Sequence, residues 1–261
     1  MDASQKWGDL TLRLTSGALL IVVGLGGVWL GGHVFHGLIA LIAGLMVWEL
    51  TRMLGGTTAR RLAALASVVL LGASYLPPAM AVPLLIAPAL VGCGQLRRGR
   101  KAFLFFTLAI LLAGYGMIKM RDDLGLLWML WLVAVVVVTD VAGYFAGRML
   151  GGPKFWPAIS PKKTWSGTVA GWIAAGIVGA IFAGLTQAGM PLVVISVAAS
   201  LASQMGDIAE SAVKRRVGVK DSSTLIPGHG GLLDRFDGML GASLMLVGMG
   251  LFVTFPPGSA P

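Results

Sequence analysis

Two pairs of acidic residues near the C-terminus have the types and spacing that could support catalysis. Asp207 and Glu210 are three residues apart, and so are Asp234 and Asp237. Residues three or four apart on a helix share a face, so each pair would present its carboxylates together. Hard divalent cations such as Mg²⁺ take oxygen ligands, usually a few carboxylates with substrate phosphates. The spacing therefore indicates a magnesium site, and a network of interfacial ion pairs is the alternative interpretation.

The segment that joins the two pairs, KRRVGVKDSSTLIPGHGGLLDR, combines basic residues with glycines. Gly228, Gly230 and Gly231 surround His229, and their flexible backbone allows N–H groups to approach phosphate oxygens. The segment precedes an expected helix start, where free amides and the helix dipole favour an anion. His229 could act as a proton donor, as a metal ligand or simply as a hydrogen-bonding loop residue.

An earlier polar segment, GRMLGGPKFWPAISPKKTWSGT, holds Lys162 and Lys163 next to Ser160 and Thr164. Such a cluster could bind a phosphate or an anionic headgroup. The alternative is an ordinary basic loop on the cytoplasmic side of a membrane protein. Basic residues that face clustered carboxylates would suit a substrate with several phosphates, with a metal ion between them.

Two further acidic residues lie in or beside apolar segments. Asp140 interrupts the run VVVVTDVAGYFAG, where a carboxylate costs several kcal/mol unless it is paired, hydrated or bound to a cation. A functional role is therefore the default interpretation of Asp140. Glu49 closes an apolar segment three residues before Arg52, and this spacing predicts an ion pair between the two.

The composition identifies the class of protein in which these residues must be positioned. Of 261 residues, 56% are hydrophobic and 12% are charged, about half the charged fraction of a soluble domain. This excludes a disordered chain and an ordinary soluble globule. The basic residues, 20 against 11 acidic ones, lie between long apolar runs, which argues against nucleic acid as a partner. The sequence predicts an integral membrane protein in a lipid bilayer.

The apolar runs predict an all-α, polytopic fold with about nine transmembrane helices, because a spanning helix needs about 20 apolar residues. The expected spans are 14–32, 34–51, 62–78, 79–96, 102–118, 124–143, 167–187, 190–212 and 233–254. Pro83 and Pro88 interrupt the fourth, which we expect to be a kinked helix.

Basic residues predict the orientation, since they mark the cytoplasmic side. With nine spans and a cytoplasmic N-terminus, all but Lys119 and Arg121 of the 20 Lys and Arg residues fall on that side. We expect residues 1–123 to form an N-terminal transmembrane region of about five spans. Residues 124–261 then form a catalytic transmembrane region whose site faces the cytoplasm.

Residues 211–237, SAVKRRVGVKDSSTLIPGHGGLLDRFD, closely resemble the signature of the phosphatidate cytidylyltransferases, or CDP-diacylglycerol synthases. The matching positions are Ser211, Lys214, Arg215, Lys220, Asp221, Pro227, His229, Gly230, Gly231, Asp234, Arg235 and Asp237. The upstream segments Asp140-x-x-x-Tyr144-x-x-Gly147-Arg148, Ser160-Pro161-Lys162-Lys163-Thr164-Trp165 and Gly206-Asp207-x-x-Glu210-Ser211 also resemble the family. The resemblance covers about residues 139–237.

The resemblance implies transfer of a cytidylyl group from CTP to phosphatidic acid, giving CDP-diacylglycerol and pyrophosphate with Mg²⁺ as cofactor. It implies Asp207, Asp234 and Asp237 as metal ligands, with Glu210 and Asp221 as weaker candidates and Asp140 at a second cation or positioning Lys162. The residues expected to act directly on the reacting groups are Asp207, Lys214, Asp234 and Asp237. Those expected to bind substrate are Lys162, Lys163, Ser211, Arg215, Lys220, His229, Gly230, Gly231 and Arg235. The resemblance also favours a homodimer in a bacterial inner membrane.

Two alternative functions belong to other classes. A CDP-alcohol phosphotransferase, another Mg²⁺-dependent membrane lipid enzyme, would carry the pattern Asp-Gly-x-x-Ala-Arg. Here Asp237-Gly238 is followed by Met-Leu-Gly-Ala, so the pattern is absent. An ion-coupled transporter would place acidic residues near the middle of the bilayer. The acidic residues of this chain cluster at the expected cytoplasmic boundary instead.

Overall fold

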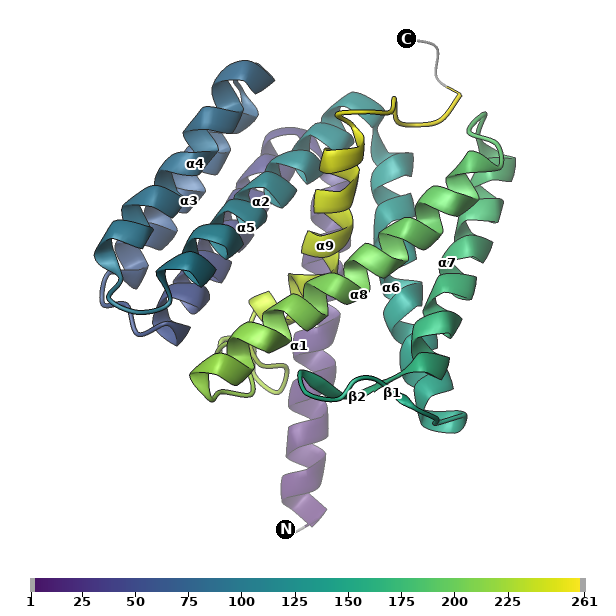
Figure 1. Cartoon of the computed structure of the whole chain (residues 1–261), viewed down its shortest axis with the longest axis horizontal. Coiled ribbons are helices and arrows are strands. Elements are labelled where there is room, and N and C mark those ends of the chain that lie inside the picture. Colours follow the sequence, from purple (N-terminus) through teal and green to yellow (C-terminus); the bar gives the residue numbers. More distant parts are fainter. Residues whose placement is uncertain (1–2, 259–261) are drawn as a thin grey trace. The chain divides into compact units, whose positions relative to one another are not determined.

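The computed structural model describes residues 3–258, and these form an almost entirely helical chain (Figure 1). The helices are α1 (Ala3–Leu30), α2 (Gly32–Met53), α3 (Ala59–Ser74), α4 (Pro78–Gln95), α5 (Arg100–Lys119), the short π-helix η1 (Met120–Leu124), α6 (Leu126–Met149), α7 (Trp165–Leu185), α8 (Pro191–Val217) and α9 (Leu233–Met249). The strands are β1 (Lys154–Trp156) and β2 (Ser160–Thr164).

Each of the expected spans corresponds to a helix, and the all-α membrane class is confirmed. Within residues 3–258, seven helices are long and apolar enough to cross a membrane. The two others are α3, with 16 residues, and α9, with 17 residues. Helix α4 continues through Pro83 and Pro88, and the kink expected there stays a prediction. The count of nine spans stays a prediction.

The outer surfaces of several helices are apolar. Val22 of α1, Val68 of α3 and Val194 of α8 are 68%, 68% and 70% exposed. Extended exposed apolar surfaces are rare on soluble monomers and mark contact with a membrane or a partner. With the seven long apolar helices, these surfaces fit a chain that is surrounded by lipid.

The described chain divides into two compact units. The first extends to Ile118 and includes Val217–Arg235, whereas the second comprises Lys119–Arg216 and the residues from Phe236 onward. In the first unit, α2 packs on α3 and α3 on α4; in the second, α6 packs on α7. The expected division of the sequence between residues 123 and 124 stays a prediction.

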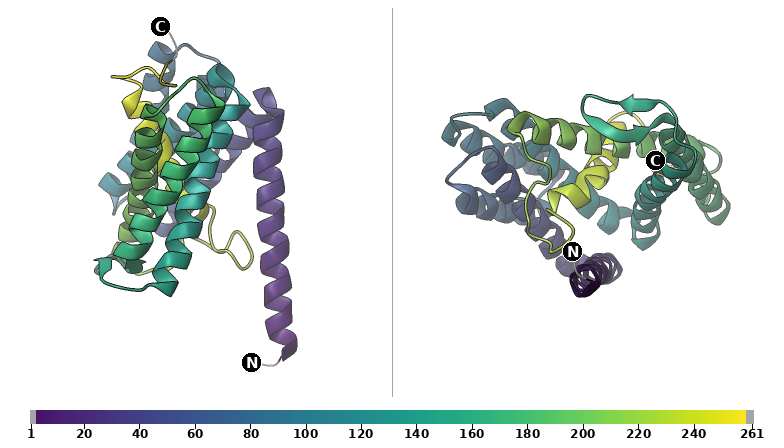
Figure 2. Two further views of the ribbon diagram at one scale, coloured as in Figure 1. Left: turned by 90° about the vertical axis from the view of Figure 1, so that its right-hand side faces the viewer. Right: turned by 90° about the horizontal axis from the view of Figure 1, so that it is seen from below.

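A small β-hairpin in the second unit was not predicted from the sequence. Strands β1 and β2 pair antiparallel, with Lys154 opposite Thr164 and Trp156 opposite Ser160. The right-hand view of Figure 2 shows the hairpin as arrows in the connection from α6 to α7. A tight turn closes it, in which the Ile159 N–H donates to the Trp156 carbonyl (3.2 Å). The segment that was expected to be a basic loop therefore contains a β-hairpin.

Glu49 of α2 anchors the glycine-rich loop, residues 218–232, within the first unit. Its side chain is fully buried, and its carboxylate accepts hydrogen bonds from the N–H groups of Leu232 (2.8 Å) and Leu233 (2.7 Å). The hydroxyl groups of Ser222 (3.3 Å) and Ser223 (2.5 Å) donate to the same carboxylate. Four donors thus satisfy one buried carboxylate, and they fix both the loop and the start of α9 to α2.

The predicted ion pair between Glu49 and Arg52 is wrong. The Arg52 guanidinium lies 5.0 Å from the centre of the Trp48 ring, in a cation–π contact. The Glu49 carboxylate is buried, and its partners are hydrogen-bond donors of the glycine-rich loop and the start of α9 instead of a basic side chain. Spacing along the helix predicted a local partner and missed a distant one.

Replacing Glu49 should destabilise the protein and loosen the loop. We expect Glu49→Ala to lower the free energy of unfolding by about 3 kcal/mol, because buried N–H and hydroxyl donors lose their acceptor. Thermal denaturation of the purified protein in detergent measures this loss. Tryptic cleavage after Lys220, an exposed residue of the loop, should become faster. Asp123→Ala, at an exposed residue of η1, is the control; equal behaviour of the two variants would refute the anchoring role.

Candidate active site

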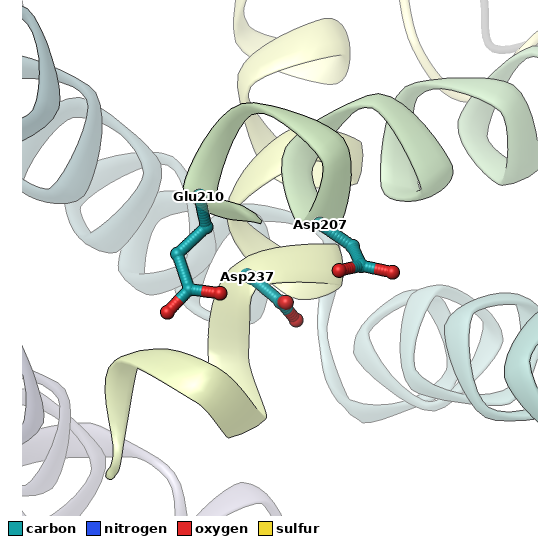
Figure 3. Close-up of side chains that lie close together, drawn as sticks. All are labelled: Asp207, Glu210 and Asp237. Carbon is teal, nitrogen blue, oxygen red and sulfur yellow. The ribbon is translucent and has the colours of Figure 1, made fainter. Parts of the chain in front are cut away.

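Three carboxylates of the second unit converge at one point. Asp207 and Glu210 lie on α8 and Asp237 lies on α9. One ligand oxygen from each lies within 4.8 Å of the others. Figure 3 shows the Asp237 carboxylate between those of Asp207 and Glu210 in this view. Glu210 is buried, and the other two residues are half-buried.

Glycines allow α8 and α9 to approach closely enough for this convergence. A Cβ atom on Gly206 of α8 would collide with the Asp237 carbonyl oxygen. A Cβ atom on Gly241 of α9 would likewise collide with the Ala202 carbonyl oxygen of α8. Backbones can come this close only where side chains are absent, as at small-residue contacts between membrane helices. The glycines therefore set the separation of the three carboxylates.

Two lysines partly balance the three carboxylates. The Lys163 ammonium of β2 lies 2.6 Å from an Asp207 oxygen, and the Lys214 ammonium lies 2.5 Å from a Glu210 oxygen. Asp207 also accepts a hydrogen bond from the Ser211 hydroxyl (3.3 Å), and Asp237 accepts one from the Gly238 N–H (2.7 Å).

The donor set fits a divalent cation. Hard cations such as Mg²⁺ take carboxylate oxygens, and Mg²⁺ usually keeps water and substrate phosphates as its remaining ligands. Three acidic side chains against two basic ones leave a negative charge at a half-buried place, which a cation would neutralise. The assignment of metal ligands stays a prediction.

A cavity of about 420 Å³ adjoins Asp207 in the second unit. Its lining comes from α6, the hairpin, α7 and α8, and includes Asp140, Tyr144, Arg148, Ser160, Lys162, Lys163, Thr164, Gln204 and Asp207. The hairpin places Lys162 and Lys163 on the cavity wall because it folds back onto the start of α7. Basic side chains, hydroxyl groups and a carboxylate shared with the cluster give this cavity the chemistry of a phosphate-binding site.

Asp234 lies in the first unit and is engaged there by the loop. One of its carboxylate oxygens accepts hydrogen bonds from the N–H (2.9 Å) and hydroxyl (2.9 Å) of Ser222 and from the N–H of Gly231 (2.8 Å). These contacts close the loop onto the first turn of α9. The structure thus gives Asp234 a visible structural role, while its predicted role as a metal ligand stays untested.

The remaining loop residues also have defined places in the first unit. The His229 ring nitrogen Nδ1 lies 2.8 Å from the Ser16 hydroxyl of α1, and the His229 carbonyl accepts hydrogen bonds from the Arg235 guanidinium. Gly230, at φ +83°, accepts from the Ile226 N–H (2.8 Å) and closes a tight turn. Arg215 at the end of α8, which belongs to the second unit, and Lys220 and Asp221 in the loop are exposed.

Sequence reasoning missed several polar residues that support the cavity. The Gln204 side chain accepts a hydrogen bond from the Trp172 indole (3.1 Å) and donates to the Thr168 carbonyl (3.2 Å). The Lys163 ammonium donates to the Gln204 carbonyl (3.2 Å), which orients it toward Asp207. Polar residues at helical spacing on α8 were the available signal, since an apolar helix rarely places them by chance.

The comparisons with known proteins agree with the resemblance seen in the motifs. The model of the cytidylyltransferase family matches residues 11–253. The phosphatidate cytidylyltransferase of Brucella suis is 47% identical over 137 residues, 52% of this chain and 51% of that protein. Proteins of the same name from Bacillus subtilis and Helicobacter pylori are 41% identical over 144 residues and 38% identical over 135 residues.

These alignments cover 52% and 51% of this chain and 54% and 50% of the two proteins, in that order. The chain thus spans about half the length of the curated relatives it matches. The family model, in contrast, extends over nearly the whole chain. On this match, the chain belongs to the cytidylyltransferase family.

Proposed function

We propose that this chain transfers a cytidylyl group from CTP to phosphatidic acid, forming CDP-diacylglycerol and pyrophosphate. The observation that carries the proposal is the convergence of Asp207, Glu210 and Asp237 beside a basic cavity. These carboxylates lie in the part of the chain, about residues 139–237, that resembles the family. Related proteins that carry the name phosphatidate cytidylyltransferase support the choice of substrates.

We further propose that the three carboxylates hold Mg²⁺. The resemblance also suggests Asp234 and Asp221 as ligands, and Asp140, which lines the cavity, as a ligand of a second cation or a partner of Lys162. The chemistry that a bound Mg²⁺ supplies is neutralisation of charge on the phosphate oxygens.

The proposed reaction needs little proton transfer by the protein. An oxygen of the phosphatidate phosphate attacks the α-phosphorus of CTP, a new P–O bond forms, and the bond to the pyrophosphate oxygen breaks. The attacking oxygen is already ionised near neutral pH, because the second pKa of a phosphate monoester is about 6. Alignment of the two phosphates and stabilisation of the departing pyrophosphate therefore become the protein's main tasks.

Basic side chains are suited to both tasks. Lys162, Lys163 and Arg148 line the cavity and would hold phosphate oxygens there. From the signature we also assign a phosphate-binding role to Lys214, Arg215, Lys220 and Arg235. Ser211, His229, Gly230 and Gly231 would contribute hydrogen bonds to substrate.

The membrane arrangement that we propose keeps the nine spans and the cytoplasmic N-terminus. Helices α3 and α9 are then short spans beside the seven long ones. The distribution of Lys and Arg favours a site on the cytoplasmic side of a bacterial inner membrane. A homodimer is part of the same proposal, through the family resemblance alone.

Family membership favours nucleotidyl transfer over the two alternatives. An ion-coupled transporter would not need a cavity with Lys162, Lys163 and Arg148 beside its acidic residues. The chain also lacks the motif of the CDP-alcohol phosphotransferases.

Removing one carboxylate of the cluster should abolish activity. We expect Asp237→Asn to lower the rate of CDP-diacylglycerol formation from CTP and phosphatidic acid by about 100-fold or more, as loss of a metal ligand would. The assay uses membranes that contain equal amounts of each variant and Mg²⁺. Asp123→Asn, the same change at an exposed residue of η1, should keep full activity. Near-normal turnover by Asp237→Asn would remove Asp237 from the site.

Removing one positive charge from the hairpin should lower activity only where the charged residue lines the cavity. We expect Lys163→Gln to lower kcat/KM by about 10-fold to 100-fold, because an ammonium that contacts phosphate oxygens is lost. Lys154→Gln changes the charge of the same hairpin at an exposed residue outside the cavity lining, and should lower kcat/KM by less than about twofold. Equal losses in both variants would mean that the hairpin acts only through its overall charge.

A further inference from the structure

A second basic cavity lies in the first unit, where α2 turns into α3. It has a volume of about 640 Å³ and is lined by Trp48, Arg52, Gly56, Thr57, Thr58, Ala59, Arg60 and Arg61. None of these residues belongs to the carboxylate cluster, to the cavity beside it or to the family signature. We call it the α2–α3 cavity.

The lining of the α2–α3 cavity is strongly cationic. Three arginines contribute to it, and among the described residues no carboxylate does. Within residues 3–258, no acidic residue forms an ion pair with Arg52, Arg60 or Arg61. The Arg52 guanidinium also contacts the Trp48 ring. Guanidinium groups of this kind match phosphate in shape and charge, so the ligand should be a phosphate-bearing anion.

The backbone of residues in the cavity lining adds hydrogen-bond donors. The first turn of α3 begins at Ala59 without a side-chain cap, and the N–H groups of Arg61 and Leu62 donate to the Thr58 carbonyl, which leaves the amides of Ala59 and Arg60 as the leading donors. Gly56 fixes the turn before it: its N–H donates to the Thr51 carbonyl (2.8 Å), and a Cβ atom there would lie 2.6 Å from Thr51 Cγ2. Helix N-termini favour anions through their free amides and their dipole.

The position of the α2–α3 cavity along the chain indicates where the phosphate comes from. Helix α2 is one of the apolar candidate spans, and the cavity begins at its last turns. Trp48 is half-buried there, and tryptophan is enriched where a bilayer meets water. Lipid phosphates are concentrated at this depth, and basic residues near a membrane surface attract anionic lipids.

We propose that the α2–α3 cavity binds the phosphate of an anionic phospholipid headgroup. The bound lipid is not a substrate of the proposed reaction, since the cavity shares no residue with the candidate active site. An adjoining cavity of about 790 Å³ shares Trp48 and Arg52 and is otherwise lined by Met53 and by residues 219–225. A lipid in the α2–α3 cavity would therefore lie next to the glycine-rich loop that Glu49 anchors.

The test measures lipid binding to the full-length protein purified in detergent. Native mass spectrometry follows titrations with dioctanoyl phosphatidylglycerol, an anionic lipid that is not the proposed substrate, and with dioctanoyl phosphatidylcholine as the net-neutral reference. We expect phosphatidylglycerol to bind more tightly than phosphatidylcholine. The double variant Arg60→Gln/Arg61→Gln should weaken phosphatidylglycerol binding about 10-fold or more.

The matched control is Arg97→Gln/Arg98→Gln, which removes the same charge from exposed arginines in the connection from α4 to α5. It should change the affinity by less than about twofold, because these arginines line no part of the α2–α3 cavity. Equal loss in both double variants, or no loss in either, would overturn the proposal. If Arg60→Gln/Arg61→Gln fails to fold, Arg52→Gln makes the same test without a change in α3.

A separate arm identifies the source of the phosphate. Inorganic phosphate is titrated against the wild-type protein by isothermal calorimetry, with phosphatidylglycerol as the comparison. We expect the lipid to bind at least about 10-fold more tightly, because its chains add apolar contact along α2. Inorganic phosphate that binds as tightly as the lipid would assign the cavity to a soluble anion and overturn the lipid assignment.

Discussion

The mutual repulsion of three carboxylates is the physical constraint on which the proposed site depends. Asp207, Glu210 and Asp237 present oxygens within 4.8 Å of one another. Each pair of unit charges at that separation costs about 3.5 kcal/mol at an effective dielectric constant of 20. Lys163 and Lys214 offset part of this cost through short ion pairs. The remaining negative charge would attract a cation, and the bound cation would in turn attract a polyphosphate.

Each of the two units has supporting contacts of its own. In the second unit, Gly206 and Gly241 let α8 and α9 approach, and the hairpin directs Lys163 toward Asp207. In the first unit, Glu49 and Asp234 use buried and half-buried carboxylates to hold the glycine-rich loop through its own N–H and hydroxyl groups. Acidic residues thus have two kinds of role in this chain. Some cluster and concentrate negative charge, and others accept hydrogen bonds from N–H and hydroxyl groups of the loop.

The sequence predicted those features that depend on local spacing. The length of the apolar runs located the helices, and three-residue spacing placed Asp207 and Glu210 on one face of α8. Glu210, ranked as a weaker ligand from the motif, lies in the cluster. The contact between Glu49 and Leu232 joins residues 183 positions apart, and spacing along the chain carries no information about such a partner. The close approach at Gly206 was equally hidden, because a glycine in a helix is compatible with many packing partners.

The most direct measurement is a crystal structure of the protein with CTP and Mn²⁺, in which anomalous scattering locates the metal. We predict an anomalous peak at coordination distance, about 2.0–2.3 Å, from carboxylate oxygens of Asp207, Glu210 and Asp237. The CTP phosphates should contact the same ion. A metal ion that binds with CTP away from all three carboxylates would contradict the central claim.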